Sequence, residues 1–365
     1  MAERGARPKV SPTRRRLLRA AEVLFTPLLP DDYLELIDPL WSSRELRGRI
    51  VSVERETADS VTIVIRPGWV WEGHEPGQYL RIGVVVDGVH HWRAYSLTSD
   101  PGRHDGFISI TPKLLDTGKV SPYLVRQARP GTIVRLGGVE GAFTLPDPTP
   151  RSLLFISAGS GITPIMSMLR DLDRRDALAD VVHVHSARTA EDVVFGAQLR
   201  ALAQRGAGYR LHLQLTATAG RASPGDIEQI CPDWRQRETF ASGPGAMLDE
   251  LAEHWERAGD RARLRMERFQ PVIDGHDAGG TGGPIRFAAS GADAASDGTV
   301  PILVAGERAG LVLPYGCRMG ICRTCVGRLS SGHVRDLRNG KVSGQRGEIV
   351  RTCINAPEGP VEIEL

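Results

Sequence analysis

Long apolar runs are absent from this chain of 365 residues. A membrane-spanning helix needs about 18 or more consecutive apolar residues, and no stretch approaches that length. The basic N-terminus also lacks the apolar core of about 7–15 residues that a secretory or twin-arginine signal requires. Arg19, Glu22 and Pro27 interrupt its apolar residues. We therefore expect a cytoplasmic protein, with peripheral contact at the inner face of the membrane as a further option.

Cysteine is scarce, with five residues in the whole chain, four of them close to the C-terminus. This does not resemble a secreted disulfide framework, and crowded cysteines in a reducing compartment more often bind metal. The spacing is C-x4-C-x2-C with a distant fourth cysteine, the ligand pattern of plant-type [2Fe–2S] ferredoxins. The alternative is a structural zinc site, but such sites usually have two symmetric C-x2–4-C pairs. We predict a [2Fe–2S] cluster on Cys317, Cys322, Cys325 and Cys353, and an inert core position for Cys231.

Positive charge is concentrated at one end of the chain. The net charge is +2, but residues 1–20 hold seven basic residues against Glu3, which gives this segment a charge of +6. A helix that begins near Ser11 would carry Arg14–Arg16 in its first turn, where positive charge opposes the helix dipole. An external anion would relieve that conflict. Three hypotheses stay open: a phospholipid surface contacted through residues 11–30, an acidic partner, or a solvated arm.

The chain divides by composition, and it contains no internal repeat. Short Val-, Thr- and Ile-rich segments between Gly, Pro and Asp turns predict an antiparallel β-barrel. Strands that alternate with helices, one of them over residues 190–205, then predict a parallel α/β sheet. A glycine-rich flexible linker leads to a compact unit with strands of its own. The predicted boundaries are 1–45 for a basic leader, 46–149 for the barrel, 150–272 for the α/β domain, 273–284 for the linker and 285–365 for the last domain.

A glycine-rich turn follows the first strand of the predicted α/β domain and opens a helix, the context in which such a turn can hold a dinucleotide phosphate. It lacks the G-x-G-x-x-G pattern, so tight packing alone could also explain it. The next strand ends at Ser186 and Arg188, with no acid in residues 186–190. Enzymes that select NAD usually place an acid there, whereas an Arg accommodates the 2′-phosphate of NADP. This favours NADPH, although a plain surface Arg remains an alternative. The candidates at the turn are Gly159, Ser160, Gly161, Thr163 and Pro164.

Two segments carry a resemblance to a known family. Pro314–Cys325 and Gly347–Cys353 resemble the ferredoxin domain of ferredoxin–NADP reductase superfamily members that carry a C-terminal cluster. Arg93-Ala94-Tyr95-Ser96 matches the Arg-x-Tyr-Ser motif of that family. The whole chain, except the extreme N-terminus, is similar to actinobacterial oxidoreductases that pass electrons to stearoyl-CoA 9-desaturases. The resemblance implies FAD in the barrel, NADPH in the α/β domain and a β-grasp α+β fold for the ferredoxin domain.

The resemblance also implies roles for individual residues. Arg93 would meet the flavin pyrophosphate, Tyr95 would stack on the isoalloxazine ring, and Ser96 would lie near flavin N5. The further FAD candidates are Leu97, Thr98, Thr111, Lys113, Gly118, Val120 and Ser121. The glycine turn would bind the NAD(P)H pyrophosphate. The Cys-Gly-Pro motif of the family is Ser242-Gly243-Pro244 here, so a hydroxyl replaces the thiol beside the nicotinamide. Tyr95, Ser96 and Ser242 are therefore the catalytic candidates.

The last domain is not acidic, in contrast to typical free plant ferredoxins. Residues 285–365 contain ten Arg or Lys and eight Asp or Glu, and Arg318 and Arg323 lie inside the cluster loop. This predicts an electron acceptor with an acidic docking face. The resemblance implies a membrane-embedded di-iron fatty-acyl desaturase as that acceptor. The alternatives are the reductase component of a ring-hydroxylating or alkane oxygenase and, in a different class, a non-catalytic electron carrier or a zinc-stabilised binding protein.

Overall fold

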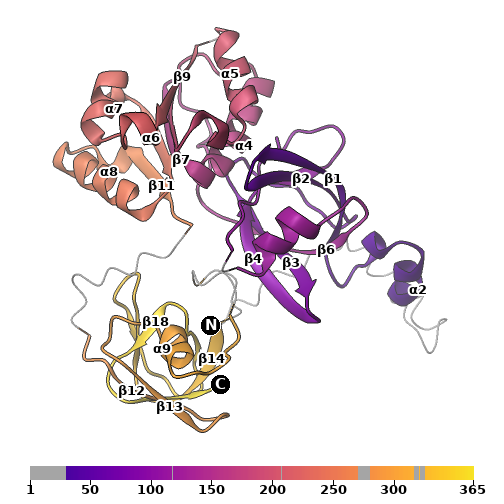
Figure 1. The fold of residues 1–365 in the computed structure, drawn as a ribbon, viewed down its shortest axis with the longest axis vertical. Helices are drawn as coiled ribbons and strands as arrows, with labels where there is room; N and C mark the ends of the chain where they lie inside the picture. Colours follow the sequence, from indigo (N-terminus) through magenta and orange to yellow (C-terminus); the bar gives the residue numbers. More distant parts are fainter. Residues whose placement is uncertain (1–29, 117, 207, 270–279, 316–319, 321–324) are drawn as a thin grey trace. The chain divides into compact units, whose positions relative to one another are not determined.

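The computed structural model describes residues 30–116, 118–206, 208–269, 280–315, 320 and 325–365 (Figure 1). Contacts divide the chain into two units. The first contains the residues up to 91 together with 95–267, and the second contains 92–94 together with the residues from 268 onward. Residues 1–29 of the predicted leader and most of the predicted linker lie outside the described residues. In the described part of the chain, no helix combines the length and the apolar character needed to cross a bilayer.

The predicted antiparallel barrel is confirmed, and its strands lie in the order β4-β3-β6-β1-β2-β5. Ile50 on β1 faces Ile65 on β2, and Ile63 on β2 faces Ile110, so alternate residues of neighbouring strands fill one core. A short helical segment packs beside this core, formed by α3 Val120–Pro122 and the π-helical turn η2 Tyr123–Gln127. The strands are β1 Arg47–Thr57, β2 Ser60–Pro67, β3 Tyr79–Val86, β4 Val89–Ser96, β5 Ile108–Ile110 and β6 Ile133–Glu140.

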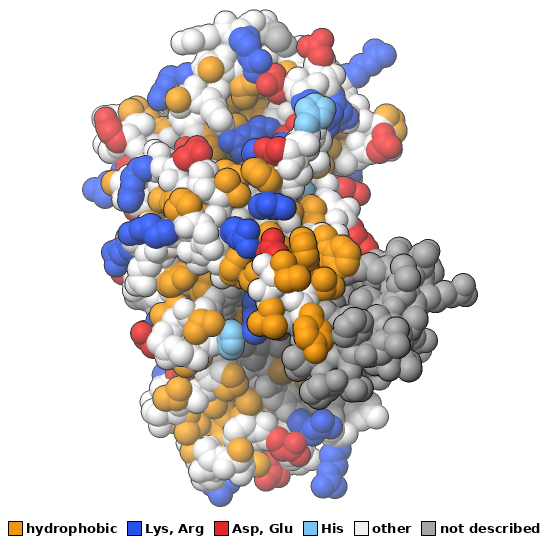
Figure 2. Space-filling view, turned by 90° about the vertical axis from the view of Figure 1, so that its right-hand side faces the viewer, with side chains coloured by type: hydrophobic (Ala, Val, Ile, Leu, Met, Phe, Trp, Pro, Cys, Tyr) orange, Lys and Arg blue, Asp and Glu red, His pale blue; other side chains and the backbone are white. Residues whose placement is uncertain are grey.

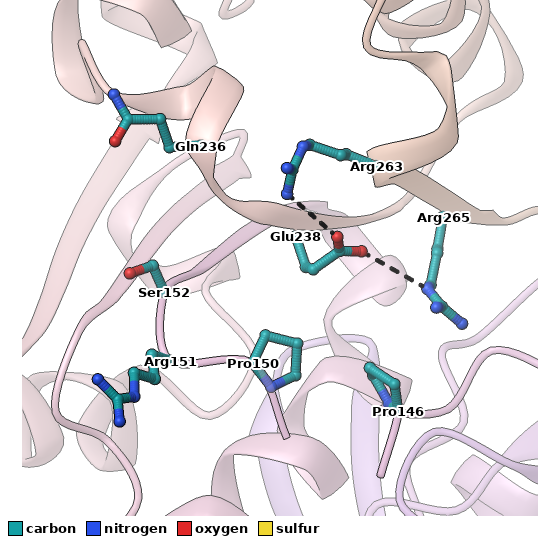
Figure 3. A pocket seen from close by; sticks show the side chains of 8 residues that line it. All are labelled: Pro146, Pro150, Arg151, Ser152, Gln236, Glu238, Arg263 and Arg265. Atoms are coloured by element: carbon teal, nitrogen blue, oxygen red, sulfur yellow. Dashed lines mark hydrogen bonds and ion pairs between the residues drawn. The ribbon is translucent and has the colours of Figure 1, made fainter. Parts of the chain in front are cut away.

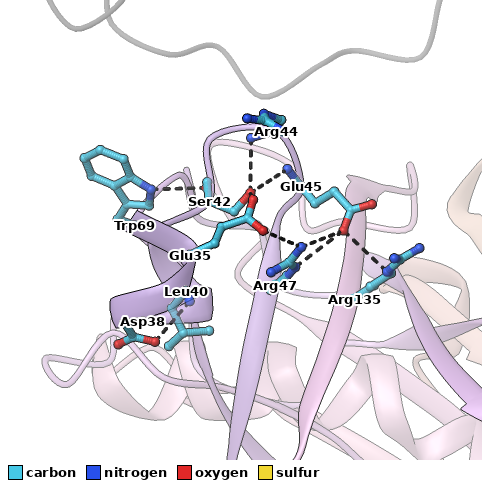
Figure 4. Close-up of polar contacts among 9 residues, drawn as sticks. All are labelled: Glu35, Asp38, Leu40, Ser42, Arg44, Glu45, Arg47, Trp69 and Arg135. Atoms are coloured by element: carbon cyan, nitrogen blue, oxygen red, sulfur yellow. Dashed lines mark hydrogen bonds and ion pairs between the residues drawn. The ribbon is translucent and has the colours of Figure 1, made fainter. Parts of the chain in front are cut away.

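The described residues begin before the barrel, inside the predicted leader. Helix α2 spans Pro30–Ile37, and the 3-10 turn η1 spans Pro39–Trp41. Both are joined to β1 through charge: Glu35 accepts from Arg47 at 3.0 Å (Figure 4), and Asp38 accepts from Arg49 at 2.8 Å. These pairs could not be predicted from sequence spacing alone, because they connect side chains that are 11 or 12 residues apart across a turn.

The predicted parallel sheet is also confirmed, with the strand order β11-β10-β7-β8-β9. Leu153 and Phe155 face α4 and α5, whereas Leu154 and Ile156 face α7 and α8, so both faces of β7 are buried. The strands are β7 Leu153–Ala158, β8 Val181–Ala187, β9 Tyr209–Leu215, β10 Glu238–Ser242 and β11 Leu264–Glu267. The helical elements are η3 Gly159–Gly161, α4 Ile162–Arg174, η4 Ala190–Asp192, α5 Gly196–Gln204, α6 Thr216–Ala219, α7 Pro224–Ile230, η5 Trp234–Gln236, α8 Gly245–Arg257 and η6 Arg261–Arg263.

The single helix predicted over residues 190–205 is wrong. The chain forms a 3-10 turn at Ala190–Asp192 and begins α5 only at Gly196. Between them, Phe195 adopts a left-handed conformation with φ 59°, buries its ring in the core and donates its backbone N–H to Glu56 of the barrel at 3.2 Å. Tertiary contacts of Phe195 therefore override the local helical pattern.

The C-terminal domain has the predicted mixed α+β architecture. Its main sheet has the order β13-β12-β19-β14-β17, and a smaller sheet has the order β16-β15-β18. Helix α9, Ile302–Arg308, packs its buried residues into the same core as Phe287 and Ile363. The strands are β12 Gly283–Phe287, β13 Ala292–Ser296, β14 Val326–Ser331, β15 Val334–Asp336, β16 Val342–Ser343, β17 Ile349–Arg351, β18 Asn355–Pro357 and β19 Val361–Glu364.

Candidate functional site

Two turns interlock at the carboxyl edge of the parallel sheet. The first is η3, which follows β7 and leads into α4, and the second is Ser242–Gly243, which follows β10. A Cβ atom on Gly161 would lie 2.1 Å from the Ser242 carbonyl oxygen, and one on Gly243 would lie 3.2 Å from Ala158 Cβ. Gly159 has φ 54°, and a Cβ there would point into open space. The two predicted nucleotide motifs therefore form one site, at the edge where open α/β sheets bind ligands.

Helix α4 also joins this site to the predicted flavin motif. The Ser167 hydroxyl donates to the Ser99 carbonyl at 2.7 Å, and the Arg170 guanidinium donates to the Thr98 carbonyl. Arg174 forms an ion pair with Asp100 at 2.8 Å. The segment that follows β4 is therefore held against the helix that begins at the glycine turn. Sequence motifs did not identify these contacts, because two of the acceptors are backbone carbonyls, which leave no signal in the sequence.

The flavin candidates lie in the barrel, most of them on β4 and just after it. Leu97 and Thr98 are fully buried, Ser96 is buried and Tyr95 packs half-buried against the barrel core. The Thr98 hydroxyl bonds Ser109 at 2.8 Å and the Thr111 hydroxyl bonds Thr62 at 2.9 Å, so both hydroxyls are used inside the barrel. A structural role thus accounts for these two threonines without a cofactor.

The other flavin candidates are placed as follows. The guanidinium of Arg93 donates to the Trp92 carbonyl at 2.9 Å. Lys113 forms an ion pair with Asp59 at 3.1 Å, so its charge is already partly compensated. Ser121 accepts the N–H of Leu115 at 3.1 Å at the start of α3, beside Val120 and Gly118. This helix start, with its Gly and Ser, could hold a phosphate.

A row of polar side chains crosses the sheet directly below the interlocked turns. Glu267, Ser242, Ser157 and His185 are register partners on four neighbouring strands, so they share one face. Ser157 Oγ bonds His185 Nδ1 at 2.7 Å, and burial lowers the pKa of His185 to about 4. His185 is therefore neutral at physiological pH.

Two oxygens in this row stand out among the described residues. Ser242 Oγ and Glu267 Oε2 are both buried and make no hydrogen bond there. Burial raises the pKa of Glu267 to about 8, so its carboxyl group is largely protonated near neutral pH. Unpaired buried polar atoms are rare, and they mark sites that a ligand or solvent completes. Sequence reasoning placed Ser242 here but assigned no role to Glu267.

The candidates for the 2′-phosphate lie at the end of β8 and just after it. Arg188 is exposed, and Ser186 is half-buried. The nearby acid Asp192 uses its carboxylate to cap the next turn, where it accepts from the Thr189 backbone N–H at 3.2 Å and from its hydroxyl at 3.1 Å. That acid is therefore committed to the turn, and Arg188 is the exposed charge next to Ser186. The arrangement suits a ribose with a 2′-phosphate.

The two described candidate cluster ligands lie at the same end of a strand pair. Val326, the first residue of β14, faces Arg351, the last residue of β17, so Cys325 and Cys353 flank this pair. Both are buried, and neither forms a disulfide. Thr352 bonds the Cys325 carbonyl through its N–H at 2.8 Å, which fixes the two cysteine backbones together. Two buried thiols held this way fit half of a four-thiolate set. The other two predicted ligands, Cys317 and Cys322, and the loop arginines Arg318 and Arg323 lie outside the described residues.

Positive charge surrounds this end of the domain. Arg351 donates to the Gly320 carbonyl at 2.7 Å, and Gly320 has φ 70° with a Cβ position only 2.4 Å from Ile354. Arg338 pairs with Asp336 at 2.7 Å, and its pKa is raised by that hydrogen bond and also by the charge of Cys353. These guanidinium groups would offset the negative charge of a thiolate-bound cluster.

We expect Cys353→Ala to abolish electron transfer through the cluster and to leave the oxidation of NADPH by the flavin intact. Loss of one thiolate should remove the cluster absorption and lower cytochrome c reduction roughly a hundredfold or more, because cluster binding needs all four ligands. Reduction of ferricyanide by NADPH should stay within about twofold, since that acceptor can take electrons upstream of the cluster. Cys231→Ala, which removes a buried thiol from the other unit, is the control. Equal loss of both activities would contradict this division.

A hollow lies at the opposite, amino-terminal edge of the parallel sheet (Figure 3). It measures about 450 Å³, and Arg263 and Arg265 share the Glu238 carboxylate at 3.4 and 4.0 Å. Because β10 begins at Glu238 and ends at Ser242, this hollow is a strand length away from the interlocked turns. It takes no part in the site described above. Its lining residues are Pro146, Pro150, Arg151, Ser152, Gln236, Glu238, Arg263 and Arg265.

Comparison with known proteins matches each domain to a family model. The oxidoreductase FAD-binding domain matches residues 72–145, the oxidoreductase NAD-binding domain matches 155–249, and the 2Fe-2S iron-sulfur cluster binding domain matches 290–358. These matches support the three groups that the residues fit: FAD, a nicotinamide dinucleotide and a [2Fe–2S] cluster.

Relatives match nearly the whole chain. An NADPH oxidoreductase of Mycobacterium tuberculosis is 49% identical over 96% of this chain and 92% of its own length. A glycine betaine monooxygenase reductase subunit of Pseudomonas aeruginosa is 29% identical over 89% and 96%. The solved structure of phthalate dioxygenase reductase, at 20% identity, shares the fold with a TM-score of 0.58 over 87% of this chain and 97% of that one. The chain therefore belongs to the ferredoxin–NADP reductase superfamily, as an NAD(P)H oxidoreductase with a C-terminal [2Fe–2S] domain.

Proposed function

We propose that this reductase takes a hydride from NADPH and delivers single electrons to a di-iron fatty-acyl-CoA desaturase in a membrane. One observation carries the electron-transfer part of the proposal: a single chain combines the interlocked turns after β7 and β10 with the buried cysteine pair beside β14 and β17. The bound groups supply the redox chemistry, since nicotinamide gives two electrons as a hydride, a cluster takes one at a time, and a flavin can do both.

The residues of the chain bind and orient these groups. The glycine turn lets a pyrophosphate approach the backbone N–H groups at the start of α4. Arg188 and Ser186 receive the 2′-phosphate, which favours NADPH over NADH. In this proposal, Tyr95, Ser96 and Ser242 hold the flavin and nicotinamide rings against each other. Because Glu267 is largely neutral near physiological pH, it adds little negative charge beside its register partner Ser242.

The class of the acceptor rests on two kinds of support. The Pseudomonas relative is named as the reductase subunit of a monooxygenase, which favours an oxygen-activating acceptor. The basic leader, with a charge of +6 in residues 1–20, favours an acceptor in or beside an anionic membrane. A soluble oxygenase is the second candidate, favoured by the same relative.

Reconstitution distinguishes the two candidates. The purified reductase, NADPH and membranes that contain a di-iron desaturase should together form the unsaturated acyl chain, and omission of the reductase should abolish it. The matched arm replaces the membranes with a soluble ring-hydroxylating oxygenase. Efficient coupling to the soluble oxygenase without coupling to the desaturase would reject the proposed acceptor.

Electron transfer to the protein acceptor should be sensitive to salt. If the acceptor presents acidic groups, raising the salt from about 50 to about 500 mM should slow coupled turnover severalfold, because screening shortens the reach of surface charge. Arg318→Glu should slow it by roughly tenfold at low salt. Reduction of ferricyanide by NADPH is the control and should change little. Coupled turnover that is indifferent to both changes would argue against an acidic docking face.

A further inference from the structure

Helix α2 and the turn η1 are amphipathic in the opposite sense to an ordinary surface helix. The two charged side chains that the structure describes in residues 33–41 face the barrel: Glu35 accepts from Ser42 at 2.6 Å and from Arg47 at 3.0 Å (Figure 4), and Asp38 accepts from Arg49 at 2.8 Å. A surface helix normally buries its apolar stripe and exposes its charges. Here the polar groups form the attachment to the barrel.

The apolar side chains of the same segment face outward. Leu36 is 79% exposed and Ile37 is 70% exposed, and Trp41 and Trp69 are both exposed. The Trp69 indole donates to the Ser42 carbonyl at 3.2 Å, so Trp69 lies beside the end of η1. The side of the molecule that carries α2 gathers hydrophobic side chains (Figure 2). We name this surface, formed by Tyr33, Leu36, Ile37, Trp41 and Trp69, the apolar platform.

The platform is firmly attached to the barrel. Leu40, between its exposed residues, is buried, and a Cβ on Gly68 would lie 2.7 Å from the Leu40 carbonyl oxygen. Glu45 adds ion pairs to Arg47 at 3.2 Å and to Arg135 of β6 at 3.4 Å. The exposed side chains therefore project from a fixed base.

The sequence next to the platform indicates what it contacts. Residues 1–29 carry seven basic and two acidic side chains, a charge of +5, and they join the chain at the start of α2. Asp31 and Asp32 at that start reduce the total to +3 over residues 1–32. A basic segment beside exposed Trp, Leu and Ile side chains is the combination by which proteins attach to an anionic bilayer surface, with Trp and Tyr at the headgroup level.

We propose that the apolar platform inserts into the surface of an anionic phospholipid bilayer, and that the positive charge of residues 1–29 supplies the electrostatic attraction to it. This inference deepens the proposed function, because it rests on an acceptor in the membrane and names the surface that meets the same membrane. It assigns the hydrophobic part of binding to residues 33–41 and Trp69, and the electrostatic part to residues 1–29.

Vesicle flotation with the full chain tests the inference. The wild-type protein should bind vesicles of phosphatidylcholine with phosphatidylglycerol and bind pure phosphatidylcholine weakly. Leu36→Gln with Ile37→Gln should weaken binding to the anionic vesicles roughly tenfold, because two apolar side chains no longer leave water. Arg14→Glu with Arg15→Glu and Arg16→Glu should remove the preference for anionic lipid. Val312→Gln, at a residue that is 99% exposed in the C-terminal domain, is the matched control and should bind as the wild type does.

Three results would overturn the inference. The first is unchanged vesicle binding by the Leu36→Gln, Ile37→Gln variant while the arginine variant loses binding, which would leave the leader as the sole anchor. The second is a wild-type dimer that this variant converts to a monomer in light scattering, which would make a second copy the occupant. The third is no vesicle binding at all.

Failure of the inference is distinguishable from failure of the proposed function. Turnover with a detergent-solubilised desaturase needs the correct acceptor but no bilayer. Turnover there without vesicle binding rejects only the platform, whereas vesicle binding without turnover rejects only the acceptor. Ferricyanide reduction by NADPH should be the same in all variants, since none of them changes a residue of the nucleotide site.

Discussion

Gly161→Ala is expected to lower the rate of ferricyanide reduction by NADPH about a hundredfold. The new Cβ atom would lie 2.1 Å from the Ser242 carbonyl oxygen, a separation that no real contact allows, so the two turns must move apart. A displacement of about 1 Å at a reacting centre can cost about a hundredfold in rate. Initial rates at saturating NADPH measure the effect.

Gly138→Ala provides the matched control for the same change of residue. A Cβ on Gly138, in β6 of the barrel, would meet no heavy atom within 4 Å, and the backbone there is not in the left-handed region. This variant should keep wild-type rates and stability. If Gly161→Ala reduced ferricyanide as fast as Gly138→Ala, the interlocked turns would not position the reacting groups.

Glu267→Gln is expected to stabilise the protein increasingly as the pH rises. The pKa of this carboxyl is about 8 in the folded chain and about 4.5 when exposed, so the unfolded state releases the proton first. The wild type therefore loses stability as the pH rises from about 4.5 through about 8. With 1.36 kcal/mol for each pKa unit, the accumulated loss is about 5 kcal/mol. Because Gln cannot ionise, the variant should not show this pH-dependent loss of stability.

Chemical denaturation at pH 5 and pH 8 measures this difference. The variant and the wild type should be similarly stable at the lower pH, and the variant should be more stable by several kcal/mol at the higher pH. Glu250→Gln, on the exposed side of α8, is the control and should follow the wild type at both values. A stability difference that does not depend on pH would show that Glu267 is ionised in the fold.

The architecture followed from sequence patterns, since strand alternation and cysteine spacing depend on residues close in the chain. The cluster ligands are an example: x4 and x2 spacing predicted the set, and the strand pair β14–β17 brings the distant Cys353 beside Cys325. The charge of the leader was visible as well. Residue spacing could not predict that helix α2, within the leader, turns its charged side to the barrel and its apolar side outward. That orientation depends on the ion pair between Glu35 and Arg47.

The polar row of the parallel sheet marks the limit of prediction from sequence. Ser242 and Glu267 are 25 residues apart in sequence, yet parallel register makes them neighbours on β10 and β11. Burial raises the pKa of Glu267, and burial depends on the tertiary fold, so no local sequence pattern predicts it. The prediction of one continuous helix through Phe195 was wrong for the same reason, because Glu56, which accepts the N–H of Phe195, lies in another domain.

The separation of the strand ends has a practical consequence for engineering the coenzyme. Ser186 is the penultimate residue of β8 and Arg188 follows that strand, whereas the interlocked turns follow β7 and β10. Because the Asp192 carboxylate caps Thr189, a new acid at position 188 would not compete with it for that turn. If Arg188 and Ser186 bind the 2′-phosphate as proposed, substitutions at this one strand end should switch the preference from NADPH to NADH and keep the turnover number.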